Sequence, residues 1–162
     1  MDRSRSVRGW QKLYNPLVVW LLRSPLQGIM GGSTMLINYT GRKSGQRFTT
    51  PVNYTEDGDT LLIVSSRGHT WWKNLSGGAP VTVRVRGQDL GGLAEAFENE
   101  EARDGLLAVL RGVPAYRRHW KVELDTNGNP AEPEALSRVA RDNVLVRVEK
   151  LVPLQEGAND GS

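Results

Sequence analysis

Short segments with the pattern of β-strands, separated by turns, dominate the sequence from residue 34 onward. Apolar and polar residues alternate within several of them, as in strands with one buried face. The predicted strands cover residues 34–39, 48–56, 61–65, 81–86, 93–98 and 144–148. Glu56-Asp57-Gly58-Asp59 is a turn of the Asp-Gly kind, which joins antiparallel strands. Strands in this order predict a mainly β (α+β) fold built as a small antiparallel barrel.

Helices are predicted around this barrel, over residues 10–26, 71–75, 100–110 and 134–141. Thr70 and Asn99 precede two of them as N-caps. The N-terminal helix, residues 10–26, carries Trp10 and Trp20 together with basic residues, which leaves two alternatives. We favour a helix that packs on the domain. The alternative is an amphipathic helix that lies on a membrane surface.

The length of 162 residues fits one domain, predicted over residues 10–153. A disordered basic N-terminus (1–9) and a disordered tail (154–162) are predicted on either side of it. The chain has no cysteine, which excludes disulfides, thiolate nucleophiles and cysteine-ligated metals. Its two histidines, His69 and His119, are far apart in sequence, so no metal site is predicted.

Positive charge is concentrated at the front of the chain. Residues 1–50 hold eight Lys and Arg residues against one acid, Asp2, although the formal net charge of the whole chain is only +3. This balance indicates an anionic ligand or membrane surface, and we expect no nucleic-acid partner because no basic stripe is interleaved with aromatics. The apolar run 17–22 is too short to span a bilayer and has no cleavage site after it. A cytoplasmic protein is therefore predicted, with peripheral membrane contact through the N-terminal helix left open.

A basic turn, Gly41-Arg42-Lys43-Ser44-Gly45, lies between the first two predicted strands. Its glycines permit a tight turn with positive φ and exposed backbone N–H groups. Arg42, Lys43 and Ser44 then form a cluster of donors suited to a phosphate or a carboxylate. A solvated hairpin tip with ordinary surface cations is the alternative. The spacing does not match a P-loop, and no Rossmann glycine motif follows a strand.

Two further segments could complete a binding site with this turn. In Ser66-Arg67-Gly68-His69 a strand ends and a helix begins, so free backbone N–H groups can bind an anion. Trp71 and Trp72 point about 100° apart on a helix, so one can be core while the other covers an aromatic ligand. Thr50-Pro51 indicates a strand edge or a bulge, where a ligand can approach the backbone. Cations at one end and tryptophan at the other suit a flavin or deazaflavin nucleotide.

These motifs, in this order, resemble the deazaflavin (F420)-dependent nitroreductase and quinone reductase family. The resemblance rests on Gly41-Arg42-Lys43-Ser44-Gly45, Thr50-Pro51-Val52, Ser66-Arg67-Gly68 and Trp71-Trp72-Lys73-Asn74-Leu75, and runs from about Tyr14 to Val148. It implies an antiparallel split β-barrel of the FMN-binding type, with coenzyme F420 as the cofactor. The cofactor-binding residues that it implies are Arg42, Lys43, Ser44, Gly45, Thr50, Pro51, Ser66, Arg67, Gly68, Trp71, Trp72 and Asn74.

One strand position departs from this resemblance. Many relatives carry arginine where this chain has Phe48, and the arginine comes one place earlier here, at Arg47. A shift of one residue in a strand reverses the face on which a side chain lies. Arg47 is therefore not assigned a role in cofactor binding.

The resemblance also implies a reaction. Reduced F420 would transfer a hydride to an electron-poor small molecule such as a quinone, a nitro compound or an activated alkene. Tyr116 and His119, in Pro114-Ala115-Tyr116-Arg117-Arg118-His119, are the candidate catalytic residues, because a phenol or an imidazole can protonate the anion that develops on the acceptor. An FMN-dependent reductase on the same barrel and a non-catalytic deazaflavin carrier are the alternatives. The acceptor and the oligomeric state stay open.

Overall fold

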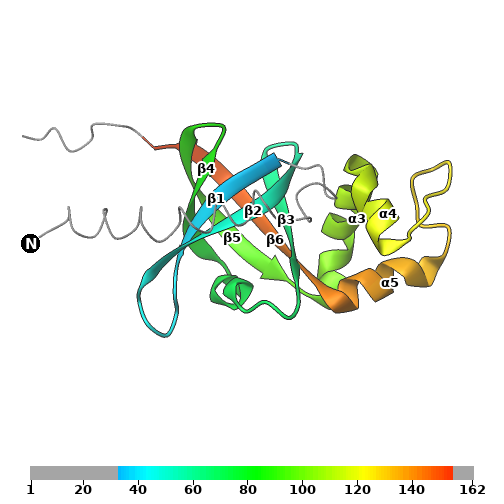
Figure 1. The fold of residues 1–162 in the computed structure, drawn as a ribbon, viewed down its shortest axis with the longest axis horizontal. Helices are drawn as coiled ribbons and strands as arrows, with labels where there is room; N and C mark the ends of the chain where they lie inside the picture. The colour runs from blue at the N-terminus through cyan, green and yellow to red at the C-terminus, as the bar shows by residue number, and fades with distance from the viewer. Residues whose placement is uncertain (1–32, 155–162) are drawn as a thin grey trace, which may run out of the picture.

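Six antiparallel strands form a closed barrel in the order β1-β2-β3-β6-β5-β4 (Figure 1). The computed structural model describes residues 33–154; the predicted N-terminal helix, the basic N-terminus and the tail from residue 155 lie outside this range. The strands are β1 (Ser33–Thr40), β2 (Arg47–Asp57), β3 (Thr60–Ser66), β4 (Ala79–Val85), β5 (Gln88–Phe97) and β6 (Asn143–Pro153). The predicted mainly β antiparallel barrel is confirmed.

Most of the helices lie between β5 and β6 in sequence and gather at one end of the molecule (Figure 1). The helices are η1 (Trp71–Leu75), η2 (Asn99–Ala102), α3 (Arg103–Gly112), α4 (Pro114–Trp120) and α5 (Pro133–Asp142). All but α4 match predicted segments. Pro114 begins α4 with its φ already fixed for a helix, and Lys121, at a φ of 55°, ends it. Within residues 33–154, no helix has the length and hydropathy needed to cross a bilayer.

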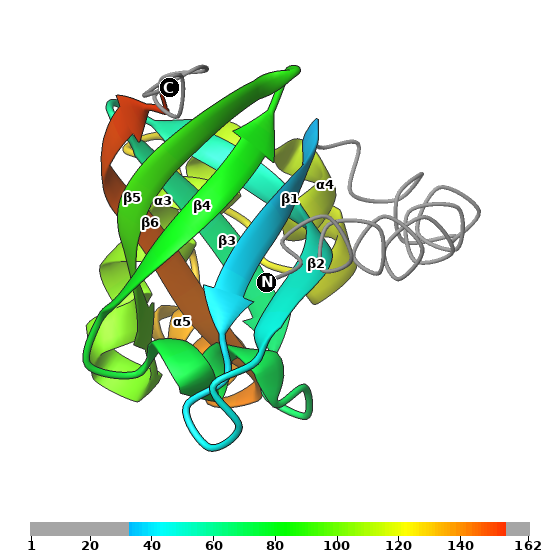
Figure 2. The same cartoon turned by 90° about the vertical axis from the view of Figure 1, so that its left-hand side faces the viewer.

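The barrel interior forms one core and the helical layer forms a second. On β1, alternate residues such as Met35, Ile37 and Tyr39 face the interior core, which is the pattern of a strand with one covered face. On β3 and β6 the apolar run is continuous, because Leu62 and Leu145 face the helical layer while their neighbours face the interior. The helices therefore cover the β3–β6 side of the barrel. In Figure 2 they lie behind the strands.

The fifth strand begins five residues earlier than predicted. Arg86 and Gly87, with φ of 52° and 76°, form a two-residue hairpin turn, so that β5 pairs with β4 from Gln88 onward. Gly91 and Gly92 break the apolar pattern on which the prediction relied, and the β5–β6 register shifts at this point. A Cβ at position 92 would lie 3.0 Å from the carbonyl oxygen of Glu149. Glycine thus permits the bulge that brings β5 close to β6.

Candidate functional site

The basic turn and the short helix η1 lie side by side at one end of the barrel (Figure 2). The backbone N–H of Arg42 donates to the side-chain oxygen of Asn74 at 3.0 Å, and the Asn74 amide donates to the carbonyl of Trp71 at 2.9 Å. The Arg42 guanidinium also donates to the carbonyl of Ser76, just beyond η1. Two of the predicted segments are therefore joined directly.

The turn itself is a compact structure rather than an open loop. The N–H of Gly41 donates to Gln46 at 2.7 Å, and the N–H of Gly45 donates to the carbonyl of Gly41 at 2.9 Å. Gly45 has a φ of 71°, and a Cβ at Gly41 would come within 2.8 Å of both the Phe48 ring and the Ser44 hydroxyl. Both glycines are thus required by this geometry. Lys43 is exposed on the turn.

Three aromatic rings lie beside the turn, and we call Tyr39, Phe48 and Trp71 the aromatic cluster. Tyr39 and Phe48 are directly paired across β1 and β2, with ring centroids 5.7 Å apart and an interplanar angle of 27°. The Trp71 ring lies 5.8 Å from Tyr39 at 43°. Polar contacts fix two of the rings: the Tyr39 and Thr50 hydroxyls lie 3.4 Å apart, and the Trp71 indole N–H donates to Ser65 Oγ at 3.1 Å. The cluster links β1, β2, β3 and η1.

The two adjacent tryptophans have different environments. Trp71 is half-buried in the aromatic cluster, whereas Trp72 is 4% exposed and belongs to the barrel core. The indole N–H of Trp72 has no hydrogen-bond partner among the described residues. Trp72 offers no accessible surface, so we drop it from the candidate cofactor contacts.

Arg67 does not extend toward the basic turn. Its guanidinium lies 3.5 Å from the Glu98 carboxylate and donates to the Asn99 side chain at 3.0 Å and the Ala140 carbonyl at 3.1 Å. These bonds hold the end of β3 to η2 and α5 and occupy the Arg67 guanidinium, whose role in anion binding stays a prediction. Ser66 and Gly68, on either side, are exposed and stay candidates.

Pro51 lies at a free strand edge, as predicted. It pairs with Leu36 on β1, whereas the β2–β3 ladder joins only residues 55–57 to residues 60–62. Within residues 33–154, the other edge of β2 at Pro51 therefore has no neighbouring strand, which suits a residue with no backbone N–H. Thr50, next to it, is already bonded to Tyr39. Arg47 pairs with Thr40 and lies on the opposite face of the strand from Phe48.

The structure does not bring the two candidate catalytic residues to this site. Tyr116 and His119 belong to α4, which Figures 1 and 2 both place away from the basic turn. Tyr116 is 7% exposed, its ring lies 4.8 Å from Trp120, and it packs in the helical-layer core. Burial raises the pKa of the Tyr116 phenol above its ordinary value of 10.0. His119 is exposed on the same helix. Tyr116 packs in the helical-layer core and His119 lies on the surface, and their catalytic role stays a prediction.

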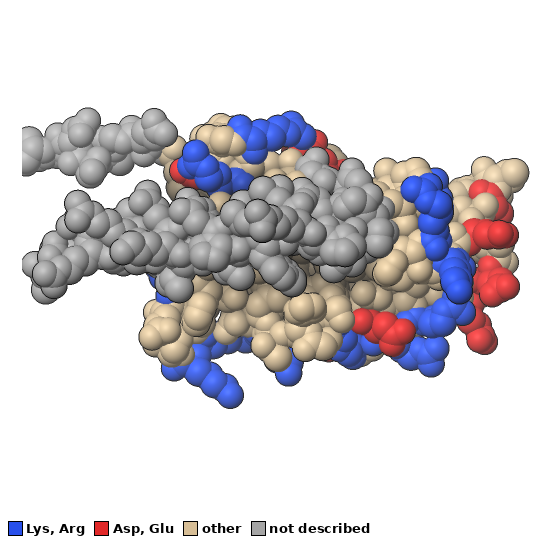
Figure 3. Space-filling model, viewed as in Figure 1, with Lys and Arg blue, Asp and Glu red and all other residues tan. Residues whose placement is uncertain are grey.

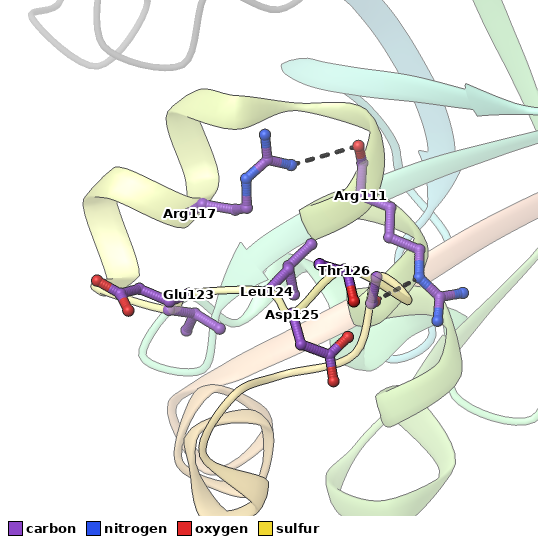
Figure 4. Close-up of a pocket in the computed structure, with 8 residues that line it drawn as sticks. Arg111, Arg117, Glu123, Leu124, Asp125 and Thr126 are labelled. Carbon is purple, nitrogen blue, oxygen red and sulfur yellow. Dashed lines mark hydrogen bonds between the residues drawn. The ribbon is translucent and has the colours of Figure 1, made fainter.

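A hollow of about 640 Å³ lies within the helical layer, apart from the aromatic cluster (Figure 4). Arg111 donates to the Gly128 carbonyl at 2.7 Å, and Arg117 donates to the Arg111 carbonyl at 3.3 Å. Asp125 accepts the N–H of Asn127 at 2.9 Å. These polar groups stabilise the turns around the hollow. Across residues 33–154, no three acidic or histidine side chains are grouped as a metal would require.

Basic side chains are spread over the face of the molecule seen in Figure 3. Lys and Arg project along the lower edge, where Figure 1 places the basic turn and η1, and also at the upper left and over the helical end. Asp and Glu side chains gather mainly at the helical end, beside some of these cations. The basic turn is therefore one of several places on this face where an anion could meet a cation.

A model of the F420H(2)-dependent quinone reductase family matches residues 23–125, which include the basic turn, the aromatic cluster and η1. The chain belongs to this family. Membership confirms the resemblance found in the sequence. The basic turn, the aromatic cluster and η1 all lie within the part of the chain that the family model matches.

Curated relatives carry the same family name. The chain is 29% identical over 101 residues to the F420H(2)-dependent quinone reductase Rv1261c of Mycobacterium tuberculosis strain H37Rv, and to MT1299 of strain CDC 1551. These matches cover 59% of this chain and 60% of each relative, so they span about three fifths of the relatives' length.

Solved structures with a related shape are more distant. An F420-H2 dependent reductase, FDR-A, is 22% identical, with a TM-score of 0.49, covering 72% of this chain and 94% of that one. General Stress Protein 26 from Bacillus anthracis is 13% identical, with a TM-score of 0.44, covering 79% and 95%. At these identities and TM-scores, neither structural similarity carries an argument about function.

Proposed function

We propose that this chain is an F420H2-dependent reductase that transfers a hydride from reduced coenzyme F420 to a small electron-poor acceptor, with a quinone as the first acceptor to test. The observation that carries the proposal is the family match over residues 23–125, which spans the basic turn, the aromatic cluster and η1. The acceptor class follows the name of the family. The membrane contact predicted for residues 10–26 lies outside the described residues and is not part of the proposal.

The residues at the barrel end fit such a cofactor. Lys43 and Ser44 on the turn, and Ser66 after β3, are exposed and can donate to phosphate or carboxylate oxygens. A Cβ at Gly68 would meet only Ser66 Oγ, at 3.9 Å, so the backbone there is open to a ligand. The half-buried Trp71 provides an aromatic surface next to these donors. When bound, the cofactor supplies the hydride.

The two cations of the turn have different roles in this proposal. Arg42 donates to the Ser76 carbonyl through its guanidinium and to Asn74 through its N–H, so it positions the turn on η1. Lys43 is the exposed cation that would bind the anionic part of the ligand. These contacts support Lys43, rather than Arg42, as the ligand contact of the turn in this proposal.

One observation favours the FMN-dependent alternative. A deazaflavin cofactor with a polyanionic tail would need several cations, and the guanidiniums of Arg42 and Arg67 are already bonded to protein acceptors. A single phosphate would need fewer cations. The family match favours the deazaflavin. The relative affinities for F420 and FMN distinguish the two alternatives.

Fluorescence titration of the purified chain with F420 and with FMN, side by side, tests the proposal. We expect tighter binding of F420. Lys43→Ala is expected to weaken F420 binding about tenfold, the effect of losing one charge-assisted contact. Arg138→Ala, which removes an exposed charge from α5, is the matched control and should leave the affinity unchanged. Tighter binding of FMN, or an effect of Arg138→Ala equal to that of Lys43→Ala, would contradict the assignment.

A further inference from the structure

Phe48 is an exposed aromatic residue at the start of β2, next to the basic turn. It is 41% exposed, and among the described residues the other large apolar side chains with comparable exposure are Val152 and Leu154. Those two lie at the C-terminal end of β6, which Figure 2 places at the opposite end of the barrel from the turn. An exposed phenyl ring therefore lies next to the basic turn.

The Phe48 ring is held in place by its neighbours. Tyr39 stacks against it, and Tyr39 is itself held between Phe48 and Trp71 and bonded to Thr50. On another side, Gly41 approaches so closely that a Cβ there would lie 2.8 Å from Phe48 Cε2. The backbone of the turn thus rests against the ring. The Phe48 side chain has no polar atom, and its open surface lies next to the turn that carries Lys43.

We propose that the open surface of Phe48 is a subsite for a planar, uncharged ring of the ligand, while Lys43 on the adjoining turn binds the anionic part. The inference rests on the proposed function and deepens it by assigning the ring contact. A ring that packs on a preorganised aromatic side chain, offset-stacked or edge-to-face, adds binding free energy beyond that of burying its apolar area. Two sources share this chemistry: the deazaflavin ring and the ring of a quinone acceptor.

The competing role for Phe48 is to close the barrel end by packing alone. A packing role needs apolar volume, which leucine or methionine supplies, whereas ring recognition needs a flat π face. Phe48→Tyr keeps that face, and Phe48→Leu removes it at similar size. Phe48→Met is a second non-aromatic variant that keeps the test valid if the leucine variant does not fold. Leu154→Ala is the control for the loss of an exposed apolar side chain elsewhere.

The test measures binding of F420 and of its riboside, the deazaflavin ring and ribityl chain without the phosphate, and the KM for menadione at saturating F420H2. For a deazaflavin ring, Phe48→Leu and Phe48→Met weaken riboside binding by roughly threefold to tenfold. In that case Phe48→Tyr retains the affinity for the riboside. Lys43→Ala weakens binding of F420 and leaves binding of the riboside unchanged. For a quinone ring, riboside binding is unchanged and the KM for menadione rises by a similar factor.

Folded leucine and methionine variants in which neither quantity changes would overturn the inference and leave the proposed function standing. An equal loss of affinity in Phe48→Tyr would also overturn it, since the ring face is then irrelevant. A wild-type chain that binds neither F420 nor the riboside would overturn the proposed function, and this inference with it.

Discussion

The side-chain oxygen of Asn74 accepts the backbone N–H of Arg42 at 3.0 Å, across 32 positions of sequence. The same side chain donates to the carbonyl of Trp71 at 2.9 Å, so both polar atoms of Asn74 are used within the protein. Asn74 was expected to contact the cofactor. These two bonds fix the basic turn onto η1, and the cofactor contact of Asn74 stays a prediction.

Removing this connection should loosen the turn. Asn74→Ala is expected to destabilise the chain by about 1 kcal/mol, the usual net value of a hydrogen bond. It should also speed hydrogen exchange at the Arg42 amide. Asn74→Asp keeps an acceptor for Arg42 and loses only the donor to Trp71, so it should retain protection at Arg42. Equal protection of that amide in wild type and Asn74→Ala would contradict the connection.

The contact between α3 and β6 depends on a glycine. A Cβ at Gly105 would overlap Cδ2 of Leu145, so Gly105→Ala must displace the buried Leu145 side chain or move α3 away from β6. We expect a loss of about 1–3 kcal/mol in the free energy of unfolding. Gly112→Ala on the same helix is the control: its Cβ would lie 3.7 Å from Thr55 Cγ2, an ordinary contact. Chemical unfolding curves compare the two variants. Because alanine favours a helix over glycine, Gly112→Ala should be neutral or stabilising. Equal losses of stability in the two variants would contradict the role of this overlap.

Arg67 should affect stability rather than ligand binding. Its guanidinium joins the end of β3 to Glu98, Asn99 and Ala140. Because the side chains of Arg67 and Glu98 are 35% and 42% exposed, solvent weakens the ion pair, and Arg67→Ala is expected to cost about 1 kcal/mol. The dissociation constant for F420 should change by less than about twofold, a free-energy difference below about 0.4 kcal/mol. A tenfold loss of affinity in a stably folded variant would return Arg67 to the cofactor site.

The buried phenol of Tyr116 predicts a specific pH dependence. Burial raises its pKa above 10.0 in the folded chain, whereas the unfolded chain loses this proton near 10.0. Its contribution to stability is therefore present below pH 10 and is lost as the pH rises through and above that value. Tyr116→Phe should lose less stability than wild type between about pH 8 and about pH 11. Urea unfolding at both values measures this, and identical losses in the two chains would contradict the raised pKa.

The sequence predicts the barrel well because most strands keep an alternating or continuous apolar pattern. It misses the first half of β5, where Gly91 and Gly92 remove that pattern, and it misses α4, which is short. The turn and η1 are predicted as neighbours because glycines, cap residues and hairpin order are local signals.

Contacts between distant residues are what the sequence does not reveal. The stacking of Tyr39 on Phe48 depends on the β1–β2 register, and the bonds of Arg67 join residues up to 73 positions apart. Tyr116 was assigned by a local motif, whereas its burial depends on how α4 packs on the helical layer. The sequence did contain one signal for Phe48. Side chains alternate in a strand, so Phe48 and Arg47 lie on opposite faces, and Phe48 is the aromatic residue that follows the basic turn.

Oxidation of F420H2 by this chain, followed by absorbance with menadione as the acceptor, tests the central claim most directly. The account predicts multiple turnovers that need both the chain and the quinone, with a lower rate in Lys43→Ala at limiting F420H2 and an unchanged rate in Arg138→Ala. A chain that binds F420 yet never oxidises F420H2 with quinones, nitroaromatics or enones would contradict the reductase assignment and leave a deazaflavin-binding protein in its place.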